Sequence, residues 1–252
     1  MEIVIIGSGN VAYHLAKALK KENLPLIQIF GRNSSALSEI AQKLEVPYST
    51  EELQKADLYI ICVSDSSIEE VSKKISNPKA LVVHTSGSLP MEVLQGNYRK
   101  GSFYPLQTFS REKELDFKEI PLFVESQNPK DTEILLNLAK NLSKHVQMAH
   151  YEQRKYIHLT AVFSCNFVNH LIARAKEISD THDLPFEYFL PLIKETFSKI
   201  ETSDPKEVQT GPARRGDTRV LKLHEELIHD PLQKKLYQIL NQSIQEMYGL
   251  DQ

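Results

Sequence analysis

The first twelve residues constrain this chain most, because a hydrophobic run leads directly into a glycine-rich turn. Residues 3–6 are four consecutive β-formers, which predict a buried parallel strand. Gly7, Gly9 and Ala12 then match the spacing G-x-G-x-x-G/A, and residues 14–19 continue in a helical pattern. A strand before this motif and a helix after it are the context that a dinucleotide-binding turn requires.

Each small residue of the turn has a physical role. Gly7 allows the tight turn, Gly9 lets a pyrophosphate approach the backbone, and Ala12 lets helix and strand pack closely. Phosphate oxygens would accept hydrogen bonds from the N–H groups at the positive end of the helix. We therefore expect a cofactor to contact Gly7, Ser8, Gly9, Asn10 and Val11. The alternative is a tight turn that holds no ligand.

The end of the second predicted strand, residues 26–30, indicates which dinucleotide is bound. An NAD-binding protein usually has an acidic residue here, which binds the ribose hydroxyls. This chain has a cation and small polar residues instead, namely Arg32, Asn33 and Ser34. A contact between Arg32 and a 2′-phosphate would contribute about 1.5–3 kcal/mol. We expect these three residues to favour NADP over NAD; the alternative is that Arg32 is a solvated loop residue.

The rest of the chain changes character near residue 151. Before it, strands at residues 56–63, 80–84, 102–104, 120–124 and 146–148 alternate with helices, which predicts a doubly wound, mostly parallel α/β sheet. After it, only helices are predicted, at residues 152–178, 186–200, 218–228 and 231–248. We predict a nucleotide-binding domain (1–150) and an all-helical substrate and dimerisation domain (151–252), with a cleft between them. The apolar stretch 159–173 should be buried on most sides.

Two polar loops follow strands of the predicted sheet. In open α/β sheets, ligands lie beyond the carboxyl ends of the strands. We therefore expect the nicotinamide end of the cofactor to contact the residues of these loops, which are Val63, Ser64, Asp65, Thr85 and Ser86. The alternative is ordinary capping, because Ser86 and Ser88 also suit a turn.

Four residues are candidates for binding the substrate. Gln107 and Thr108 supply an amide and a hydroxyl where a substrate would meet the cofactor, unless the neighbouring proline and aromatic residues simply fix that loop. Arg214 and Arg215 lie in a glycine-bracketed loop, and arginine suits bidentate capture of a carboxylate or phosphate. The alternative for the second pair is an exposed basic loop.

The long helix carries the candidate catalytic residues, His158 and Asn166. A rotation of about 100° per residue places them within about 80° of each other, so both can line one wall. An imidazole titrates near neutral pH, so His158 is suited to give a proton to a carbonyl or imine, with Asn166 orienting the substrate. The alternative is a hydrogen-bonded core histidine.

Composition excludes several other classes of protein. The net charge of −3 shows no basic footprint for nucleic acid. No apolar run is long enough to span a bilayer and no signal peptide is visible, so we expect a cytoplasmic protein with no membrane partner. Cys62 and Cys165 lie in apolar runs and are expected to be buried free thiols. His224 and His229 lie about 140° apart on a helix, so we predict no metal site.

Four motifs together resemble a known bacterial family. They are residues 7–12, 84–88, 104–109 and 210–217, and they resemble the Rossmann-like NADP oxidoreductases with a C-terminal domain of unknown function. More distantly, the chain is similar to pyrroline-carboxylate reductase and to the 6-phosphogluconate and hydroxyisobutyrate dehydrogenases. The resemblance implies a Rossmann fold, a helical second domain that forms a homodimer, and a cleft for small carboxylates.

One departure limits what the resemblance implies. The hydroxyacid dehydrogenases use a lysine four residues before an asparagine on the long helix; if Asn166 matches that asparagine, the lysine position holds Val162. Their catalytic mechanism therefore does not transfer. We predict an NADP-dependent oxidoreductase that acts on a small anionic carbonyl, imine or alcohol. The alternative is a non-catalytic NADP-binding sensor or scaffold.

Overall fold

The computed structural model describes residues 1–250 and divides the chain into two compact units, Met1–Phe167 and Val168–Gln252. The division falls inside the long helix, later than the boundary at residue 150 expected from the sequence. The reason is that the first turns of this helix are bonded to the sheet of the first unit, through Arg154 and Glu125. Each unit is described separately.

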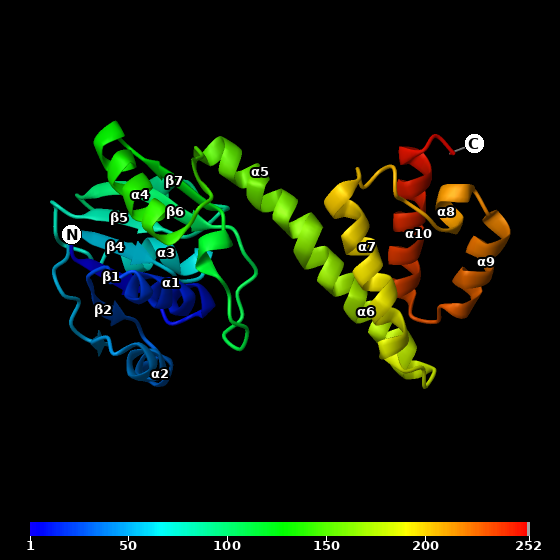
Figure 1. The fold of residues 1–252 in the computed structure, drawn as a ribbon, viewed down its shortest axis with the longest axis horizontal. Helices are drawn as coiled ribbons and strands as arrows, with labels where there is room; N and C mark the ends of the chain where they lie inside the picture. The colour runs from blue at the N-terminus through cyan, green and yellow to red at the C-terminus, as the bar shows by residue number, and fades with distance from the viewer. Residues whose placement is uncertain (251–252) are drawn as a thin grey trace. The chain divides into compact units, whose positions relative to one another are not determined.

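The first unit is built on one eight-stranded sheet (Figure 1). The strand order is β3-β2-β1-β4-β5-β6-β7-β8, and every neighbouring pair is parallel except β6 and β7. The chain reverses its direction of travel across the sheet between β1 and β4, which is where α/β sheets of this kind bind ligands. The strands are β1 (Ile3–Ile6), β2 (Leu26–Phe30), β3 (Tyr48–Ser49), β4 (Leu58–Ile61), β5 (Leu81–His84), β6 (Arg99–Pro105), β7 (Leu122–Ser126) and β8 (Val146–Met148).

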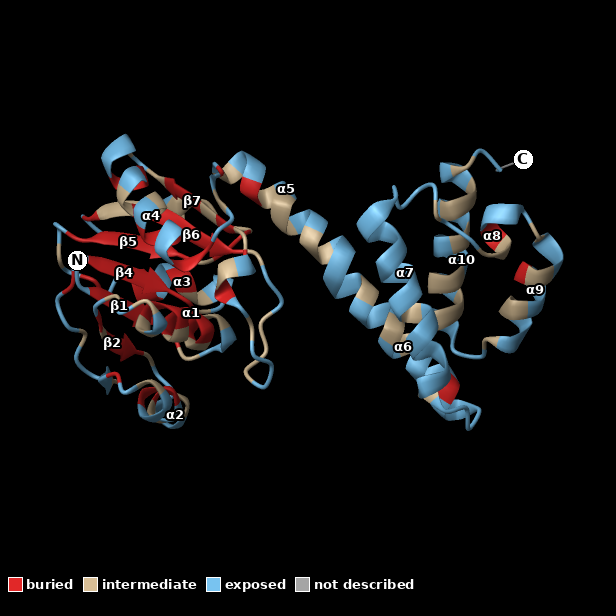
Figure 2. Ribbon diagram, in the orientation of Figure 1, coloured by how far each residue is buried: buried red, intermediate tan, exposed pale blue. Residues whose placement is uncertain are grey.

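Helices cover both faces of this sheet, so the predicted doubly wound α/β fold is confirmed. Alternate residues of β1 enter different cores, with Ile3 and Ile5 in one and Val4 and Ile6 in the other. Figure 2 shows the central strands β1, β4 and β5 as buried. The helices are α1 (Asn10–Lys21), α2 (Ser34–Leu44), α3 (Asp65–Ser72) and α4 (Pro129–Leu142), with short 3-10 helices at Met91–Val93 and Phe117–Glu119.

Residues 151–181 are helical throughout, as predicted, but the expected burial of their middle is wrong. The segment consists of α5 (Tyr151–Ala161), a π-helical stretch η3 (Val162–Phe167) and α6 (Val168–Thr181). Phe163 is 64% exposed and Cys165 is exposed as well, so only Cys62 fits the expectation of a buried thiol. No element of the first unit covers the helix at Phe163 and Cys165. The sequence pattern alone does not reveal this exposure.

The second unit contains only helices among its described residues, as the sequence predicted. Its helices are α6, α7 (Leu190–Thr202), α8 (Pro212–Arg215), α9 (Thr218–Leu227) and α10 (Pro231–Met247), with a 3-10 turn at Phe186–Phe189. Asp217 and Asp230 cap α9 and α10, and Pro231 starts α10. No helix within residues 1–250 is long and apolar enough to cross a membrane.

Candidate active site

The turn between β1 and α1 has a backbone shape that favours glycine. Gly7 has a φ of 139°, and a Cβ built on it would lie 2.2 Å from the Cys62 carbonyl oxygen, just beyond β4. The Gly7 N–H donates to the Phe30 carbonyl oxygen of β2 at 2.8 Å. The turn is therefore held between the ends of the two strands that flank β1.

The N-terminus of α1 fits a diphosphate. Gly9 is the N-cap residue, and no side chain caps the helix. A Cβ on Gly9 would meet no atom within 4 Å, so a ligand has room to approach the backbone. The first N–H groups of the helix and its dipole favour an anion here. The Asn10 amide group donates instead to the Phe109 carbonyl oxygen at 2.8 Å, so Asn10 would bind phosphate through its backbone.

A cavity of about 250 Å³ lies beside this turn, at the carboxyl ends of β1, β2 and β4. No acidic side chain lines it, whereas two cationic ones do, Arg32 and Lys74. The Lys74 ammonium group lies 5.9 Å from the centre of the Phe30 ring. The sequence analysis missed Lys74, which lies just after α3. The lining residues are 6–9, 30–33, 62–64, Ser67, Val71 and Lys74.

The other predicted cofactor residues of this region divide into two groups. Asn33, Val63 and Ser64 line the cavity, and the Asn33 side chain also caps α2 by accepting from the Ala36 N–H at 3.1 Å. Ser34 and Asp65 begin α2 and α3 and do not line the cavity. Contact of Ser34 and Asp65 with a cofactor stays a prediction.

Thr85 and Ser86 have hydrogen bonds that belong to the loop after β5. The Thr85 hydroxyl donates to the Ile61 carbonyl oxygen at 3.3 Å. The Ser86 Oγ accepts from the N–H groups of Ser88 and Leu89 at 3.1 and 3.2 Å. These bonds match the capping role that the sequence left open, and a cofactor contact by either residue stays a prediction.

A second and larger cavity, of about 980 Å³, brings together four of the predicted site residues. Gln107, Thr108, His158 and Asn166 all line it, the first two from the loop after β6 and the others from α5 and η3. The remaining lining residues are Tyr104, Leu106, Phe109, Glu152, Gln153, Tyr156, Ile157, Thr160, Ala161, Ser164 and Cys165. Polar groups thus converge on a cavity wall that also has apolar parts, as substrate sites usually do.

His158 forms a hydrogen bond that the sequence did not predict. The Tyr104 hydroxyl lies 3.0 Å from His158 Nδ1. Tyr104 is buried, and this burial raises the pKa of its hydroxyl to about 12, against the opposing effect of Arg154. Tyr104 stood in a motif that the sequence analysis singled out, but no pattern connects it with a residue so far along the chain.

A buried ion pair fixes the start of α5 on the sheet. Arg154 is fully buried, and it bonds Glu125 of β7 at 2.5 Å and the carbonyl oxygens of Ser86 and Leu89 at 3.2 and 2.6 Å. Burial and this guanidinium lower the pKa of nearby His84 to about 4, which keeps its imidazole neutral. No local sequence pattern indicates this pair, because Arg154 and Glu125 lie in separate elements.

Comparisons with known proteins agree with this geometry. The family model described as "NADP oxidoreductase coenzyme F420-dependent" matches residues 2–87. A second family model, described as "Domain of unknown function (DUF2520)", matches residues 120–244. No protein of curated function matches the chain. A solved structure named "putative NADP oxidoreductase", from Bacteroides fragilis, is 44% identical over 97% of this chain and 98% of its own, with a TM-score of 0.92.

The chain belongs to this family of NADP oxidoreductases. It is an NAD(P)-dependent oxidoreductase with a Rossmann-like first domain and a C-terminal domain of unknown function, as the resemblance implied. Two further structures share the fold. A protein of Thermotoga maritima is 23% identical (98% and 99% coverage, TM-score 0.81), and a 1-pyrroline-5-carboxylate reductase of Streptococcus pyogenes is 16% identical (99% of both chains, TM-score 0.63).

In this oxidoreductase, one loop connects the two cavities. The loop after β6 carries Gln107 and Thr108 into the larger cavity, and its next residues are bonded to the dinucleotide turn. His14 Nε2 lies 2.9 Å from the Ser110 carbonyl oxygen, and Arg111 donates to the Ser8 carbonyl oxygen while pairing with Glu39 at 2.9 Å. The glycine-rich turn, α1 and the loop after β6 therefore hold one another in place.

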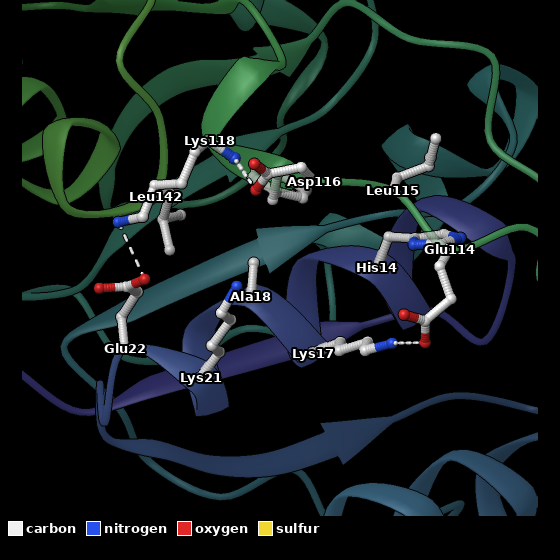
Figure 3. Close-up of a pocket in the computed structure, with 11 residues that line it drawn as sticks. His14, Lys17, Ala18, Lys21, Glu22, Glu114, Leu115, Asp116, Lys118 and Leu142 are labelled. Carbon is white, nitrogen blue, oxygen red and sulfur yellow. Dashed lines mark hydrogen bonds and ion pairs between the residues drawn. The ribbon is translucent and has the colours of Figure 1, made fainter.

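The same loop ends in a small surface notch beside α1 (Figure 3). Its volume is about 100 Å³. Ion pairs between Lys17 and Glu114 (2.6 Å) and between Lys118 and Glu22 (2.8 Å) connect its walls. These pairs tie the loop to α1 and neutralise four of the charged groups of the notch, so the notch is a poor candidate for a ligand site.

The two remaining predicted substrate residues line neither the cavity beside the glycine-rich turn nor the larger cavity. Arg214 and Arg215 belong to the second unit, where both are exposed and the Arg214 guanidinium stacks 4.0 Å from the centre of the Tyr248 ring. Val162 and Asn166 lie in the π-helical stretch, whose altered turn is a feature often found at functional sites. Within residues 1–250, no three His, Cys, Asp or Glu side chains meet in a metal-binding group.

Proposed function

We propose that this oxidoreductase uses NADP to transfer a hydride to or from a small carboxylate-bearing carbonyl, imine or alcohol. The observation that carries the proposal is the cavity beside the glycine-rich turn, which has Arg32 and Lys74 in its lining and no carboxylate. A 2′-phosphate is attracted to such a lining, whereas the acidic residue that binds the ribose of NAD has no counterpart. The nicotinamide, when bound, supplies or accepts the hydride.

The chain's own residues bind and orient the reactants. The turn from Gly7 to Val11 holds the diphosphate, and Gln107 and Thr108 hold the reacting group of the substrate. His158 carries a proton for the oxygen or nitrogen that receives it, and Asn166 orients that atom. Arg214 and Arg215 of the second unit, whose exposed guanidinium groups suit bidentate binding, stay the predicted partners of a carboxylate.

The direct test is a substrate screen with the full-length protein. NADPH consumption is followed with a panel of small oxo acids, cyclic imino acids and matched compounds without a carboxylate. We expect turnover with carboxylate-bearing members alone. Tight NADPH binding without turnover across the panel would favour the non-catalytic sensor, and a calorimetric titration that shows no binding of any nicotinamide coenzyme would overturn both functions.

Cofactor preference is tested separately with Arg32→Asp. Loss of a charge-assisted contact worth about 1.5–3 kcal/mol should weaken NADPH binding roughly 10- to 150-fold relative to NADH. Lys21→Asp is the matched control, because Lys21 is an exposed cation of α1 outside the cavity. An unchanged ratio of NADPH to NADH affinity in Arg32→Asp contradicts the assignment of NADP.

We also propose that the protein forms a homodimer through its helical unit. The support is the number of large apolar side chains that this unit exposes, among them Leu192, Leu227 and Leu232. Large exposed apolar surface often marks an interaction site. A monomeric mass in light scattering at micromolar concentration would contradict the proposal. Neither nucleic acid nor membrane is proposed as a partner, and a cytoplasmic location stays a prediction.

A further inference from the structure

The hydrogen bond between Tyr104 and His158 joins two elements at the wall of the larger cavity. Tyr104 lies near the end of β6, and His158 lies on α5, one helical turn after the buried Arg154. The two rings meet edge to face with centroids 6.1 Å apart, and the Tyr104 hydroxyl is 3.0 Å from His158 Nδ1. Both side chains line the cavity that holds Gln107, Thr108 and Asn166.

The surroundings of Tyr104 decide which group donates. Its side chain is buried, and its hydroxyl makes no other hydrogen bond within residues 1–250. If Nδ1 donated, the phenolic proton would have no acceptor in the described part of the protein. If the phenol donates, its proton is satisfied and Nδ1 accepts. The pKa of Tyr104, which burial raises to about 12, agrees with a hydroxyl that keeps its proton.

This assignment fixes the other nitrogen of the ring. A neutral imidazole carries one proton, so an Nδ1 that accepts leaves the proton on Nε2. Nε2 makes no hydrogen bond with the described residues, and it is not among their buried unpaired polar atoms, so it is accessible in a half-buried residue that lines the cavity. The proton is therefore presented where a substrate would lie.

Gly87 provides the space for this contact. A Cβ on Gly87 would lie 2.7 Å from Tyr104 Cζ and 2.9 Å from His158 Cβ, closer than side-chain carbons approach. The same loop is bonded to α5, because Arg154 Nε donates to the Ser86 carbonyl oxygen at 3.2 Å. Loop, strand and helix thus meet at one point, and a side chain at residue 87 would separate them.

We propose that Tyr104 is a positioning residue that holds His158 in the tautomer with its proton on Nε2, facing the cavity, and that Gly87 makes their contact possible. The inference deepens the proposed function, because it rests on His158 as the group that gives the proton. It goes beyond that function by assigning the nitrogen that carries the proton and the residue that determines it.

The test is nitrogen NMR of the full-length protein labelled at histidine, with His158→Asn used to assign the His158 signals. In the wild type we expect one tautomer for His158, with an unprotonated Nδ1 and a protonated Nε2. In Tyr104→Phe, which keeps the ring and removes the hydroxyl, both tautomers should be populated. Tyr59→Phe is the matched control, since it removes another buried hydroxyl, one that donates to the Gln54 carbonyl oxygen at 2.8 Å.

Two results would overturn the inference. One is a wild-type His158 with its proton on Nδ1, a measurement that does not depend on whether Tyr104→Phe folds. The other is a Tyr104→Phe spectrum identical to that of the wild type. Neither result depends on turnover, so the inference and the proposed function fail separately. Once a substrate is known, Tyr104→Phe should lower kcat with the KM for NADPH unchanged, whereas Tyr59→Phe should change neither.

Discussion

The two units of this protein differ in how much apolar surface they bury. In the first unit, every residue of β1 and β5 is buried and helices cover both faces of the sheet. In the second unit, only Ser179, Ala213 and Leu221 are buried among residues 168–250. Burial of apolar surface is the main driving force for folding. The first unit therefore contains its own core, whereas the second leaves much of its apolar surface to be covered.

The same polar contact occurs in both units, in different surroundings. A tyrosine hydroxyl lies 3.0 Å from a histidine Nδ1 in the pair Tyr104–His158 and again in the pair Tyr237–His224. The first pair lies next to the fully buried Arg154 and lines the candidate active site, whereas the second lines a groove of about 650 Å³ between α6, α9 and α10. The two pairs have the same distance between hydroxyl and imidazole, so they differ in the residues that surround them and not in their geometry.

The strongest test of the difference between the units is Arg154→Met. Removing one member of a buried ion pair leaves the Glu125 charge without its partner, which should cost about 3–5 kcal/mol of unfolding free energy. Hydrogen exchange measured by peptide should show the loss in β1 and β4 of the first unit. Adding Glu125→Leu should recover much of it, because an apolar pair replaces the lone charge.

The matched control for this variant is Lys73→Met, which breaks an exposed pair with Glu69 in the same unit. An exposed pair contributes about 0–1 kcal/mol. If Arg154→Met lowers the unfolding free energy by no more than this control does, the buried pair does not attach α5 to the sheet. The division of the chain inside the long helix then has another cause.

The next largest effect is expected from Gly7→Ala, compared with Gly9→Ala. A Cβ at Gly7 meets the Cys62 carbonyl oxygen in a backbone conformation that favours glycine, so we expect a loss of about 2–4 kcal/mol in the first unit. A Cβ at Gly9 meets nothing, so only the poorer N-cap that alanine provides should lower the stability, by about 1 kcal/mol. Gly9→Ala should nevertheless weaken NADPH binding, and equal affinity in calorimetry would show that the diphosphate lies elsewhere.

A dilution series tests whether a second copy covers the helical unit. If a dimer forms there, each tenfold increase in protein concentration should add up to about 1.4 kcal/mol to the exchange protection of α10. Strand β1, which is buried within its own unit, should not respond. Protection of α10 that is independent of concentration, together with a monomeric mass, would mean that another partner covers this surface or that none does.

Most helices and strands were predictable, because each is specified by a local sequence pattern. The strand of residues 3–6, its glycine turn and the capped helix that begins at Pro231 are specified by residues adjacent in sequence. The parallel direction of most strands followed from alternation, because a helix between two strands returns the chain to the edge of the sheet where the first strand began. His158 and Asn166 were placed on one wall from the helical period alone, and both line the same cavity.

The contacts that complete the site were not predictable, because they join residues far apart in sequence. Tyr104 with His158 and Arg154 with Glu125 each connect a strand to α5. Lys74 reaches the cavity beside the glycine-rich turn because Ile68 and Val71 of α3 pack in one core with Ile6 and Phe30. The apolar middle of the long helix was wrongly expected to be buried. An apolar sequence indicates that a surface should be covered, but it does not indicate which other surface covers it.

The smallest expected effect on stability comes from removing one helix cap in the second unit. The Asp217 carboxylate accepts from the Val220 N–H at 3.2 Å and starts α9, so Asp217→Ala should cost about 1 kcal/mol, measured as faster exchange in α9. Asp217→Asn keeps the acceptor and should retain most of the protection. In the first unit, a loss of this size would be small compared with the stability that its extensive core provides. In the second unit, where α9 buries only Leu221, it should bring α9 much closer to opening. If exchange in α9 of Asp217→Ala matches the wild type, this helix is stabilised mainly by what covers it, and the exposed face of the second unit is less exposed in solution than in a single chain.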